Sequence, residues 1–353
     1  MSGVQQFTVG PDEAEQRLDR WFRRQFPHIT QGRLEKLCRK GEIRVDGGRV
    51  KTSTRIGPGQ VVRVPPLPPA PAGPPGALQL APMCPSESEA RMLANAIVWR
   101  DEHIIVLNKP PGLAVQGGSG QRRHLGAMLS ALRLGREDDP RLVHRLDKDT
   151  SGLLVLARTS AAAVELTRLF RSRAVDKVYF AVVAGRPEPD RGTIRYGLVK
   201  AGGKGQSERM QIVHPAEVTA IEGAKAAATD YRVIEQLAGR AAWVAMRPVT
   251  GRTHQLRAHI AAIGCPIVGD GKYGGRGQEN DGSGWGSGLG GAVSRKLHLH
   301  AARLAFRHPS SGRSMIFTAP LPEHMARTFK LMDWDPVNVP DPLFDVFEGT
   351  NCA

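Results

Sequence analysis

Apolar positions near the start of the chain recur with the spacing of an α-helix. The positions that share one helical face are Leu18, Trp21, Phe22 and Phe26. Pro27 then interrupts the pattern, because its ring cannot continue a helix. A short amphipathic helix is therefore predicted to end before Pro27.

A second helix and a hairpin are predicted directly afterwards. Thr30 can accept a hydrogen bond from the first turn of a helix, and Gly41 suits a helix end because glycine adopts left-handed backbone easily. Residues 43–45 then indicate a strand, the Asp-Gly-Gly sequence at 46–48 a tight turn, and residues 61–64 a closing strand.

A proline-rich stretch divides the chain. Residues 65–75 hold seven prolines, a composition typical of a semi-rigid spacer. We expect a small domain at 16–66, a linker at 67–92 and a catalytic-sized domain at 93–335. Within the large domain, the Gly-rich residues 274–291 predict a flexible surface insertion.

The pattern in the large domain is one of short apolar runs separated by turns. Strands are predicted at 104–107, 153–157, 179–183 and 242–246. Helices are predicted at 160–170 and 253–263. In the first helix, the side chains expected to face partly inward are those of Val164, Leu166, Leu169 and Phe170. This mixture indicates an α+β fold.

The charge of the chain predicts a polyanionic partner. The net charge is +15, and residues 16–66 hold 13 Lys and Arg against 4 Asp and Glu, so the field near the start attracts polyanions. That segment resembles the small RNA-binding domain named after ribosomal protein S-four, in which the second helix and the following hairpin form the RNA surface. The candidate phosphate-binding residues here are Arg33, Lys36, Arg39, Lys40 and Arg44.

One carboxylate lies between two cations. In the run H-R-L-D-K-D-T-S-G at 144–152, Asp147 is flanked by Arg145 and Lys148 and precedes the apolar run 153–157. Nearby positive charge favours the ionised form of a carboxylate, and an ionised carboxylate fixed on a turn can act as a nucleophile. An isolated pair of this kind is also common on solvated turns.

Two further polar motifs follow in the same domain. Lys177 and Tyr179 alternate along a predicted strand and so share one face. The sequence G-R-T-H-Q-L-R-A-H occupies 251–259, at the entry to the predicted helix 253–263. Spacing alone does not show that these motifs converge.

Together the motifs resemble the RluA-type pseudouridine synthases, which convert uridine in RNA to its carbon-linked isomer. The resemblance covers nearly all of residues 95–320 in family order. The matching segments are N-K-P-P-G-L-A-V at 108–115, the 144–152 run with its apolar continuation, Lys177 and Tyr179, 251–259, G-C-P-I-V-G-D-G-K-Y-G at 264–274, and L-H-L-H-A at 297–301.

The resemblance implies a role for each site residue. Asp147 corresponds to the nucleophile, Tyr179 to the tyrosine that stacks on the flipped base and can take the proton from carbon 5, and Arg145 to the arginine that helps to extrude the nucleotide. Arg252 corresponds to the arginine paired with the carboxylate, and Arg257 is the second candidate for that pairing.

The resemblance also implies a fold and a target. We expect the pseudouridine synthase fold, a mixed and mainly antiparallel sheet with flanking helices, plus a small N-terminal α/β RNA-binding domain. Because the reaction oxidises and hydrolyses nothing, no metal and no organic cofactor is expected. The expected partner is large-subunit ribosomal RNA, and the expected form of the protein is a monomer. The C type of the family is most similar, with the D type or another RNA target of the same family as the alternative.

Other functions fit the residues less well. An aspartic protease would use the Asp-Thr-Ser-Gly turn at 149–152 but needs a second carboxylate sharing its proton, and a glycosidase using Asp147 and Asp149 needs a raised pKa that cationic surroundings oppose. A non-catalytic RNA-binding ribosome-assembly protein would not need Asp147, Tyr179 and Arg252 together. A zinc site would draw on His254, His259, His298 and His300.

Localisation is expected from composition. The first thirty residues lack the apolar core of a secretory signal, and no apolar run is long enough to span a bilayer. The cysteines show no paired spacing and predict reduced thiols in a cytoplasmic protein; they are Cys38, Cys84, Cys265 and Cys352.

Overall fold

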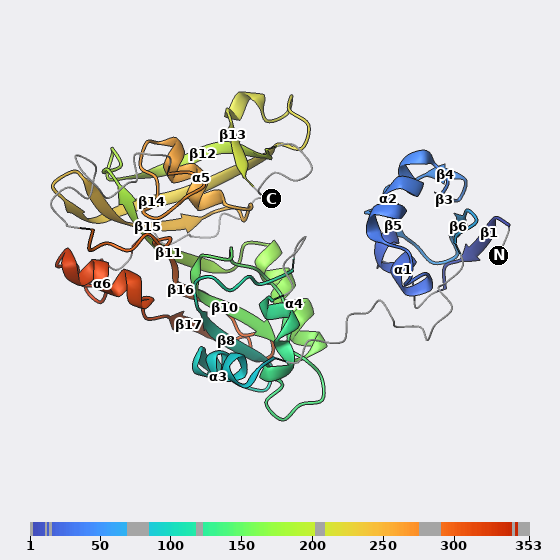
Figure 1. Ribbon diagram of the computed structural model, residues 1–353, viewed down its shortest axis with the longest axis horizontal. Coiled ribbons are helices and arrows are strands. Elements are labelled where there is room, and N and C mark those ends of the chain that lie inside the picture. Colours follow the sequence, from blue (N-terminus) through green and yellow to red (C-terminus); the bar gives the residue numbers. More distant parts are fainter. Residues whose placement is uncertain are drawn as a thin grey trace. The chain divides into compact units, whose positions relative to one another are not determined.

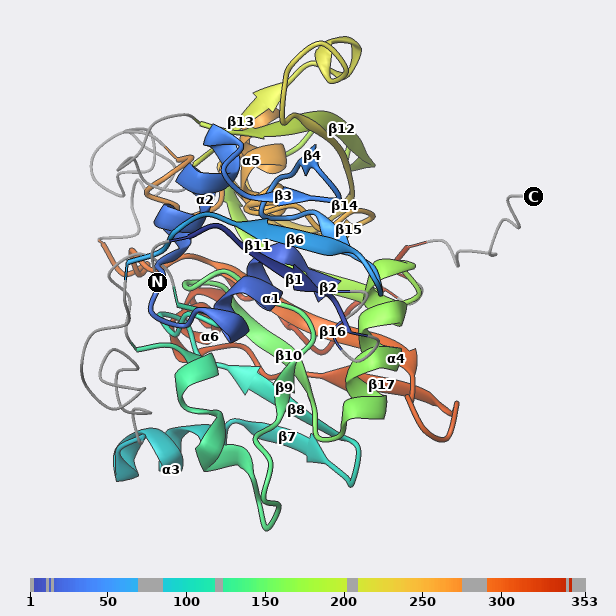
Figure 2. The same cartoon turned by 90° about the vertical axis from the view of Figure 1, so that its right-hand side faces the viewer.

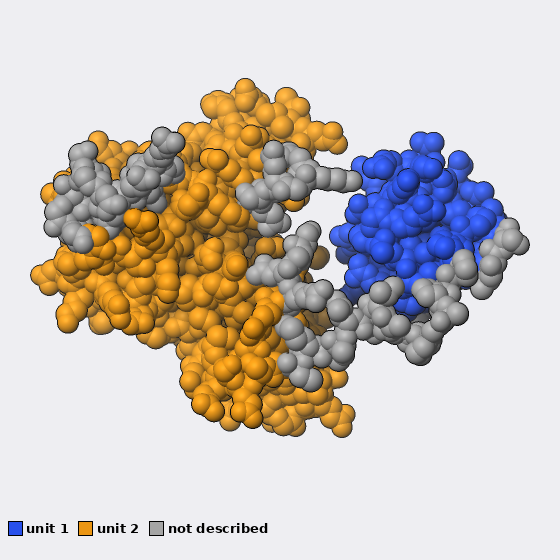
Figure 3. Space-filling model, in the orientation of Figure 1, with its two compact units in different colours: residues 1–82 blue, residues 83–353 orange. Residues whose placement is uncertain are grey.

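The computed structural model divides the chain into two compact units, residues 1–82 and 83–353 (Figure 3). It describes residues 3–10, 13, 16–68, 85–117, 123–201, 209–274, 291–340 and 343–344. Most of the predicted linker, nearly all of the predicted Gly-rich insertion, Cys84 and Cys352 therefore lie outside the described residues. Within them, helices are too short or too polar to cross a membrane.

The first unit is a small α/β domain built from local signals. Its helices are α1 (Leu18–Gln25) and α2 (Gln31–Lys40), and its strands are β1 (Gln5–Thr8), β2 (Gln16–Arg17), β3 (Arg44–Val45), β4 (Gly48–Arg49), β5 (Arg55–Ile56) and β6 (Val61–Val64). Thr30 accepts a hydrogen bond from the Arg33 amide, and Gly41 ends α2 with a φ of 72°. Both helices and the β3–β4 hairpin confirm the sequence predictions.

The core of this unit is aromatic. Trp21 and Phe22 of α1 are buried, and the ring of Phe7 on β1 meets Trp21 edge-on at 5.8 Å. Leu34 and Leu37 of α2 complete this core, which leaves the cationic side of α2 in solvent. The unit therefore has its own hydrophobic interior.

The second unit contains a large mixed sheet (Figures 1 and 2). Its strands are β7 (Ile97–Arg100), β8 (Ile104–Lys109), β9 (Arg141–Leu142), β10 (Ser151–Ala157), β11 (Asp176–Ala184), β12 (Arg191–Lys200), β13 (Met210–Val213), β14 (Lys225–Leu237), β15 (Ala241–Pro248), β16 (Leu299–Arg307) and β17 (Ser314–Thr318). The helices are α3 (Glu87–Asn95), α4 (Ser160–Arg171), α5 (Gln255–Ala262) and α6 (Glu323–Leu331).

Strand order explains how distant motifs meet. The order is β13-β12-β14-β15-β11-β16-β10-β8-β7, with β17 beside β16 and β9 beside β10. Among the described pairings, only β10 with β16 is parallel. This places β10, which follows Asp147, and β11, which carries Tyr179, on either side of β16. The α+β, mainly antiparallel class predicted from sequence is confirmed.

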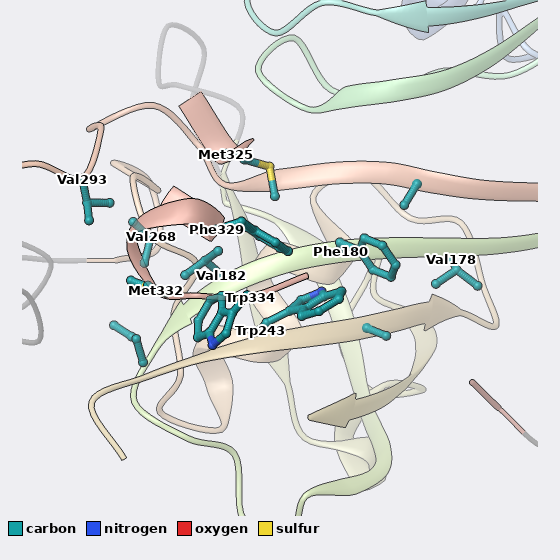
Figure 4. Packing of buried hydrophobic residues seen from close by; sticks show 14 residues of the cluster. Val178, Phe180, Val182, Trp243, Val268, Val293, Met325, Phe329, Met332 and Trp334 are labelled. Atoms are coloured by element: carbon teal, nitrogen blue, oxygen red, sulfur yellow. The ribbon is translucent and has the colours of Figure 1, made fainter. Parts of the chain in front are cut away.

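Helices cover both faces of the central strands. On one face, Trp243 of β15 packs against Phe180 of β11 and Phe329 of α6, with ring centroids 5.1 and 4.9 Å apart (Figure 4). On the other, Leu256 and Ile260 of α5 join the core. Every residue of β10 is buried, as expected for a strand covered on both faces.

Two sequence predictions for this unit were wrong. Val164 of α4 is 72% exposed, because Ala162, Leu166 and Leu169 form the inward stripe and Val164 lies on the opposite side. The predicted linker, 67–92, extends too far, since α3 begins at Glu87 with a capping box between Ser86 and Glu89.

Candidate active site

The predicted site residues meet around one cavity of the second unit. Its volume is about 320 Å³, and Asp147, Tyr179, Arg252 and Arg145 all line it. Lys177, His254 and Arg257 belong to the same wall. Three segments that are far apart in sequence thus supply one pocket with an acid, a phenol and several cations.

Asp147 sits on a tight turn that the sequence fixes locally. The Thr150 amide donates to the Asp147 carbonyl at 3.2 Å, and Leu146 beside it is buried, which anchors the turn to the core. β10 starts at the following residue, Ser151. The carboxylate side chain is 17% exposed, so it faces the cavity while most of its surface contacts protein.

Two side chains of the α5 segment reach the same carboxylate oxygen. Arg257 Nη1 and His254 Nε2 each lie 3.9 Å from Asp147 Oδ2. Arg257 is itself held by two hydrogen bonds to Asp270, Nε to Oδ2 at 2.8 Å and Nη2 to Oδ1 at 2.7 Å. Paired donors of this kind fix a guanidinium in one plane.

Asp270 also keeps Arg257 charged. Burial lowers the pKa of Arg257, but the hydrogen bond and charge of Asp270, together with Asp147, outweigh it and raise the pKa above its ordinary value. A permanent cation therefore faces Asp147 from a buried position.

Arg252, predicted as the partner of Asp147, occupies a different place. It is exposed at the cavity wall, and its Nε donates to the Ala226 carbonyl at 3.4 Å. The predicted pairing of Arg252 with Asp147 is wrong in this structure, and Arg257 makes it. The reason is that α5 begins only at Gln255, so Arg252 precedes the helix while Arg257 lies in its first turn.

Tyr179 lies in β11 with its phenol toward the cavity. Burial, and then the charge of Asp147, raise the pKa of Tyr179 above its ordinary value. The phenol therefore stays protonated at neutral pH, which suits a stacking group and opposes its action as a resting base. Lys177 lines the same cavity, as the predicted alternation requires.

Sequence reasoning missed two residues that shape this site. The Lys109 ammonium group donates to the carbonyl of Lys148, next to Asp147, at 3.1 Å. His254 approaches Asp147 directly. Both belong to quoted motifs, N-K-P-P-G and G-R-T-H-Q, but neither motif indicates which side chain meets the carboxylate.

Two of the histidines considered for zinc make hydrogen bonds within the fold. His298 Nε2 lies 2.9 Å from the hydroxyl of Thr328, and His300 Nδ1 lies 2.9 Å from that of Ser151. In the part of the chain that the structure describes, there is no cluster of three or more potential metal-ligating residues of the His, Cys, Asp or Glu type. Cys38 and Cys265 are buried free thiols.

Comparisons with known proteins identify the family. The chain matches the RNA pseudouridylate synthase model over residues 103–262 and the S4 domain over residues 16–62. It is 35% identical over 336 residues to the ribosomal large subunit pseudouridine synthase C of Vibrio cholerae, covering 93% of this chain and 97% of the relative. The chain belongs to the RNA pseudouridylate synthase family.

Further relatives agree. The synthase C of Escherichia coli is 35% identical over 321 residues, covering 90% of this chain and 93% of that protein. The solved structure of human RNA pseudouridylate synthase domain containing 4 superposes with a TM-score of 0.56 at 28% identity, covering 69% of this chain and 95% of that chain. As a pseudouridylate synthase the protein is an isomerase, which decides against the hydrolase interpretations.

Most of the predicted RNA-binding residues of the S4 domain are exposed to solvent. The exposed ones are Arg33, Lys36, Arg39 and Lys40. Arg44 differs, because its guanidinium donates to the carbonyls of Gly41 and Gly47 at 3.2 Å each. It therefore has a structural role in tying the helix end to the hairpin, and its role as a phosphate contact stays a prediction.

Proposed function

We propose that this protein isomerises specific uridines to pseudouridine in large-subunit ribosomal RNA, with Asp147 as the nucleophile. The observation that carries the proposal is the placement of Asp147 Oδ2 3.9 Å from both Arg257 and His254, at the wall of a cavity that Tyr179 also lines. Relatives named synthase C, alike over more than 90% of this chain, support the target and the C type.

The bond changes define what the site must do. The bond from nitrogen 1 of uracil to the anomeric carbon breaks, a bond from carbon 5 to that carbon forms, the carbon 5 proton leaves, and nitrogen 1 gains a proton. Asp147 supplies an electron pair, either to the anomeric carbon of the sugar or to the pyrimidine ring. All heavy atoms stay within one nucleotide, while the carbon 5 proton is released to solvent and the proton on nitrogen 1 is taken up from it.

The nucleotide must leave its stack before it can reach Asp147. Extruding a base costs a few kcal/mol. Arg145 is exposed at the cavity mouth and is positioned to contact the displaced backbone, while Tyr179 offers an aromatic face for the extruded base. Phosphate contacts by the cationic residues of the S4 domain offset part of the cost.

We further propose a division of labour between the units. Residues 16–66 bind RNA, and residues 93–335 carry out the chemistry. The S4 match and the exposed cationic face of α2 support the first assignment, and the cavity supports the second. A monomer in the cytoplasm, where ribosomal RNA is available to a soluble enzyme, is the form that we propose.

The test is tritium release from ribosomal RNA that carries uridine tritiated at carbon 5. We expect Asp147→Asn to lower the rate at least about 1,000-fold, because an amide has no anionic electron pair. Asp149→Asn is the matched control: Asp149 is exposed in the same loop and should retain activity within about threefold.

Two outcomes would count against the proposal. Equal loss in both variants would indicate damage to the loop and not loss of a nucleophile. Tight RNA binding by the unmodified protein without any tritium release would instead identify a non-catalytic RNA-binding protein.

A further inference from the structure

A chain of polar contacts links the start of β13 to Asp147. The Met210 amide donates to the Tyr273 hydroxyl oxygen at 2.8 Å. That hydroxyl lies 3.1 Å from His254 Nδ1, and the other ring nitrogen, Nε2, lies 3.9 Å from Asp147 Oδ2. Tyr273 comes from the G-D-G-K-Y-G segment, so four separate parts of the chain meet in this contact series.

The Met210 amide fixes the direction of the first hydrogen bond, and the direction of the second depends on the tautomer of His254. A backbone amide only donates, so the Tyr273 oxygen accepts from Met210 and can give its own proton to His254 Nδ1. Burial raises the pKa of Tyr273, which keeps that proton on the hydroxyl at neutral pH. A neutral imidazole that accepts at Nδ1 carries its proton on Nε2, facing Asp147.

Tyr273 also holds the second partner of Asp147. The Arg257 guanidinium carbon lies 5.4 Å from the centroid of the Tyr273 ring, and that of Arg209 lies 5.5 Å away, both within the range of cation–π attraction. One aromatic residue therefore contacts both side chains that approach Asp147 Oδ2.

The backbone of His254 shows that this arrangement is specific. His254 has a φ of 51°, in the left-handed region that residues with a side chain rarely adopt, and it precedes α5 without capping it through its side chain. Such conformations are strained and persist where the surroundings enforce them. Here the conformation directs the imidazole between Tyr273 and Asp147 and not toward the helix amides.

We propose that His254, held by Tyr273 in the tautomer with the proton on Nε2, is a positioning residue that orients the Asp147 carboxylate through Oδ2. This inference rests on the proposed role of Asp147 as nucleophile. Nε2–H and Arg257 Nη1 approach one oxygen together, so the carboxylate plane is set before the uridine enters the cavity.

A neutral donor suits this position better than a second cation. Arg257 already supplies a permanent positive charge beside Asp147, and more charge would weaken the carboxylate as a nucleophile. A hydrogen bond received from Tyr273 at Nδ1 stabilises the neutral ring. His254 therefore fixes the orientation of Asp147 without adding charge.

The experiment measures single-turnover conversion of ribosomal RNA by the full-length protein with three variants. His254→Ala removes the donor and should lower the rate constant about 10- to 100-fold with KM for RNA changed less than about twofold. His254→Gln places an uncharged amide N–H near the Nε2 position and should stay within about threefold of the original protein. His214→Gln, at an exposed histidine, is the control for the substitution itself.

A double-mutant cycle isolates the tautomer effect. Tyr273→Phe should lower the rate constant about fivefold in the original protein, because the imidazole can then turn its lone pair toward Asp147. In the His254→Gln background the same change should cost less than about twofold, since glutamine has no tautomer to select. Melting temperatures of all variants show whether each is folded.

Three results would overturn the inference. His254→Gln as slow as His254→Ala would mean that the ring itself transfers a proton. An equal cost of Tyr273→Phe in both backgrounds would assign the tyrosine a purely structural role. Raised KM with an unchanged rate constant would place His254 in RNA binding. Failure of the proposed function has a different signature, namely no conversion by the unaltered protein.

Discussion

Lys109 shows how a single buried amine can organise the catalytic turn, although burial lowers its pKa to about 7 against the opposing charges of Asp149 and Asp147. Its side chain is almost fully buried, at 1% exposure, and its three ammonium protons match three carbonyl acceptors. The distances from Nζ are 2.9 Å to Pro110, 2.8 Å to Leu113 and 3.1 Å to Lys148. Sequence patterns do not reveal this role, because all three acceptors are backbone atoms.

Lys109→Met is expected to destabilise the second unit and slow the reaction. Methionine fills the space but removes one donor from each of three carbonyl groups, of which that of Lys148 still accepts from the Gly112 amide at 2.9 Å. We expect a loss of about 2 kcal/mol in the free energy of unfolding. Urea denaturation measures it. Lys148→Met is the control, because that side chain is exposed while its carbonyl is retained. Equal stability of the two variants would contradict this role for Lys109.

His259, unlike Lys109, is a buried polar side chain without hydrogen bonds among the described residues. It is fully buried, and neither ring nitrogen has a hydrogen-bond partner among the described residues. Burial lowers the pKa of His259 to about 4. Between pH 6.5 and 4 the unfolded chain therefore binds a proton that the folded chain does not, so stability falls as the pH drops through that window.

His259→Leu is expected to stabilise the protein by about 1 kcal/mol at pH 7, since a similar apolar volume needs no hydrogen bond. The advantage over the original protein should grow as the pH falls from 6.5 toward 4. Denaturation midpoints across this range measure it, with His214→Leu as the exposed control. A variant that is destabilised, or whose advantage is independent of pH, would contradict this account.

At the scale of elements, β10 and β16 carry the catalytic turn. Gly152 has a φ of 109°, and a Cβ there would collide with the backbone of Ala301. The Ser151 hydroxyl and His300 Nδ1 form a hydrogen bond of 2.9 Å across the same pair of strands. The parallel pairing of β10 with β16 thus needs glycine directly after the turn, which gives the Thr-Ser-Gly sequence a structural reason beside its chemistry.

Gly152→Ala is expected to cost at least about 3 kcal/mol in unfolding free energy and to lower activity, because the strands must separate to admit the methyl group. Gly135→Ala is the matched control: its φ of 87° carries similar backbone strain, but nothing lies within 4 Å of a Cβ there. Urea denaturation compares the two. A similar loss in both would show that backbone strain, and not the close approach of β16, sets the cost.

Local signals were readable from the sequence, and side-chain directions were not. Thr30 and Gly41 bound α2 as expected, and β8, β10, β11 and β15 all fall where apolar runs predicted strands. The capping box at Ser86 was also readable but lay beyond a proline-rich run. Which of Arg252 and Arg257 lies beside Asp147 depends on the residue at which α5 begins, and the short motif that contains both arginines does not encode that residue.

At the scale of the whole molecule, cationic side chains gather in two places, the surface of the S4 domain and the cavity of the second unit. The predicted phosphate contacts on α2 are exposed in the S4 domain, while the cations of the cavity range from buried Arg257 to exposed Arg145 and Arg252. The +15 net charge indicated a polyanionic partner, and the family match agrees. Composition did not distinguish Arg44 from the exposed cations of α2, because Arg44 differs from them in its hydrogen bonds to Gly41 and Gly47.

Replacing the exposed residues Arg33, Lys36, Arg39 and Lys40 by glutamine should weaken ribosomal RNA binding and reduce its salt dependence. Four lost phosphate contacts lower the slope of log affinity against log salt by about 3. Filter binding at several salt concentrations measures it. Arg44→Gln should leave the slope unchanged and lower the stability of the S4 domain. An unchanged slope in the fourfold variant would contradict this assignment.

The most direct test of Asp147 and of its target is made in cells. Carbodiimide-resistant reverse-transcription stops map pseudouridine in large-subunit ribosomal RNA from a strain that lacks this protein. We predict that specific stops are missing, that the intact gene restores them, and that the Asp147→Asn form does not although it accumulates to the same level. Restoration by the Asp147→Asn form would contradict the account.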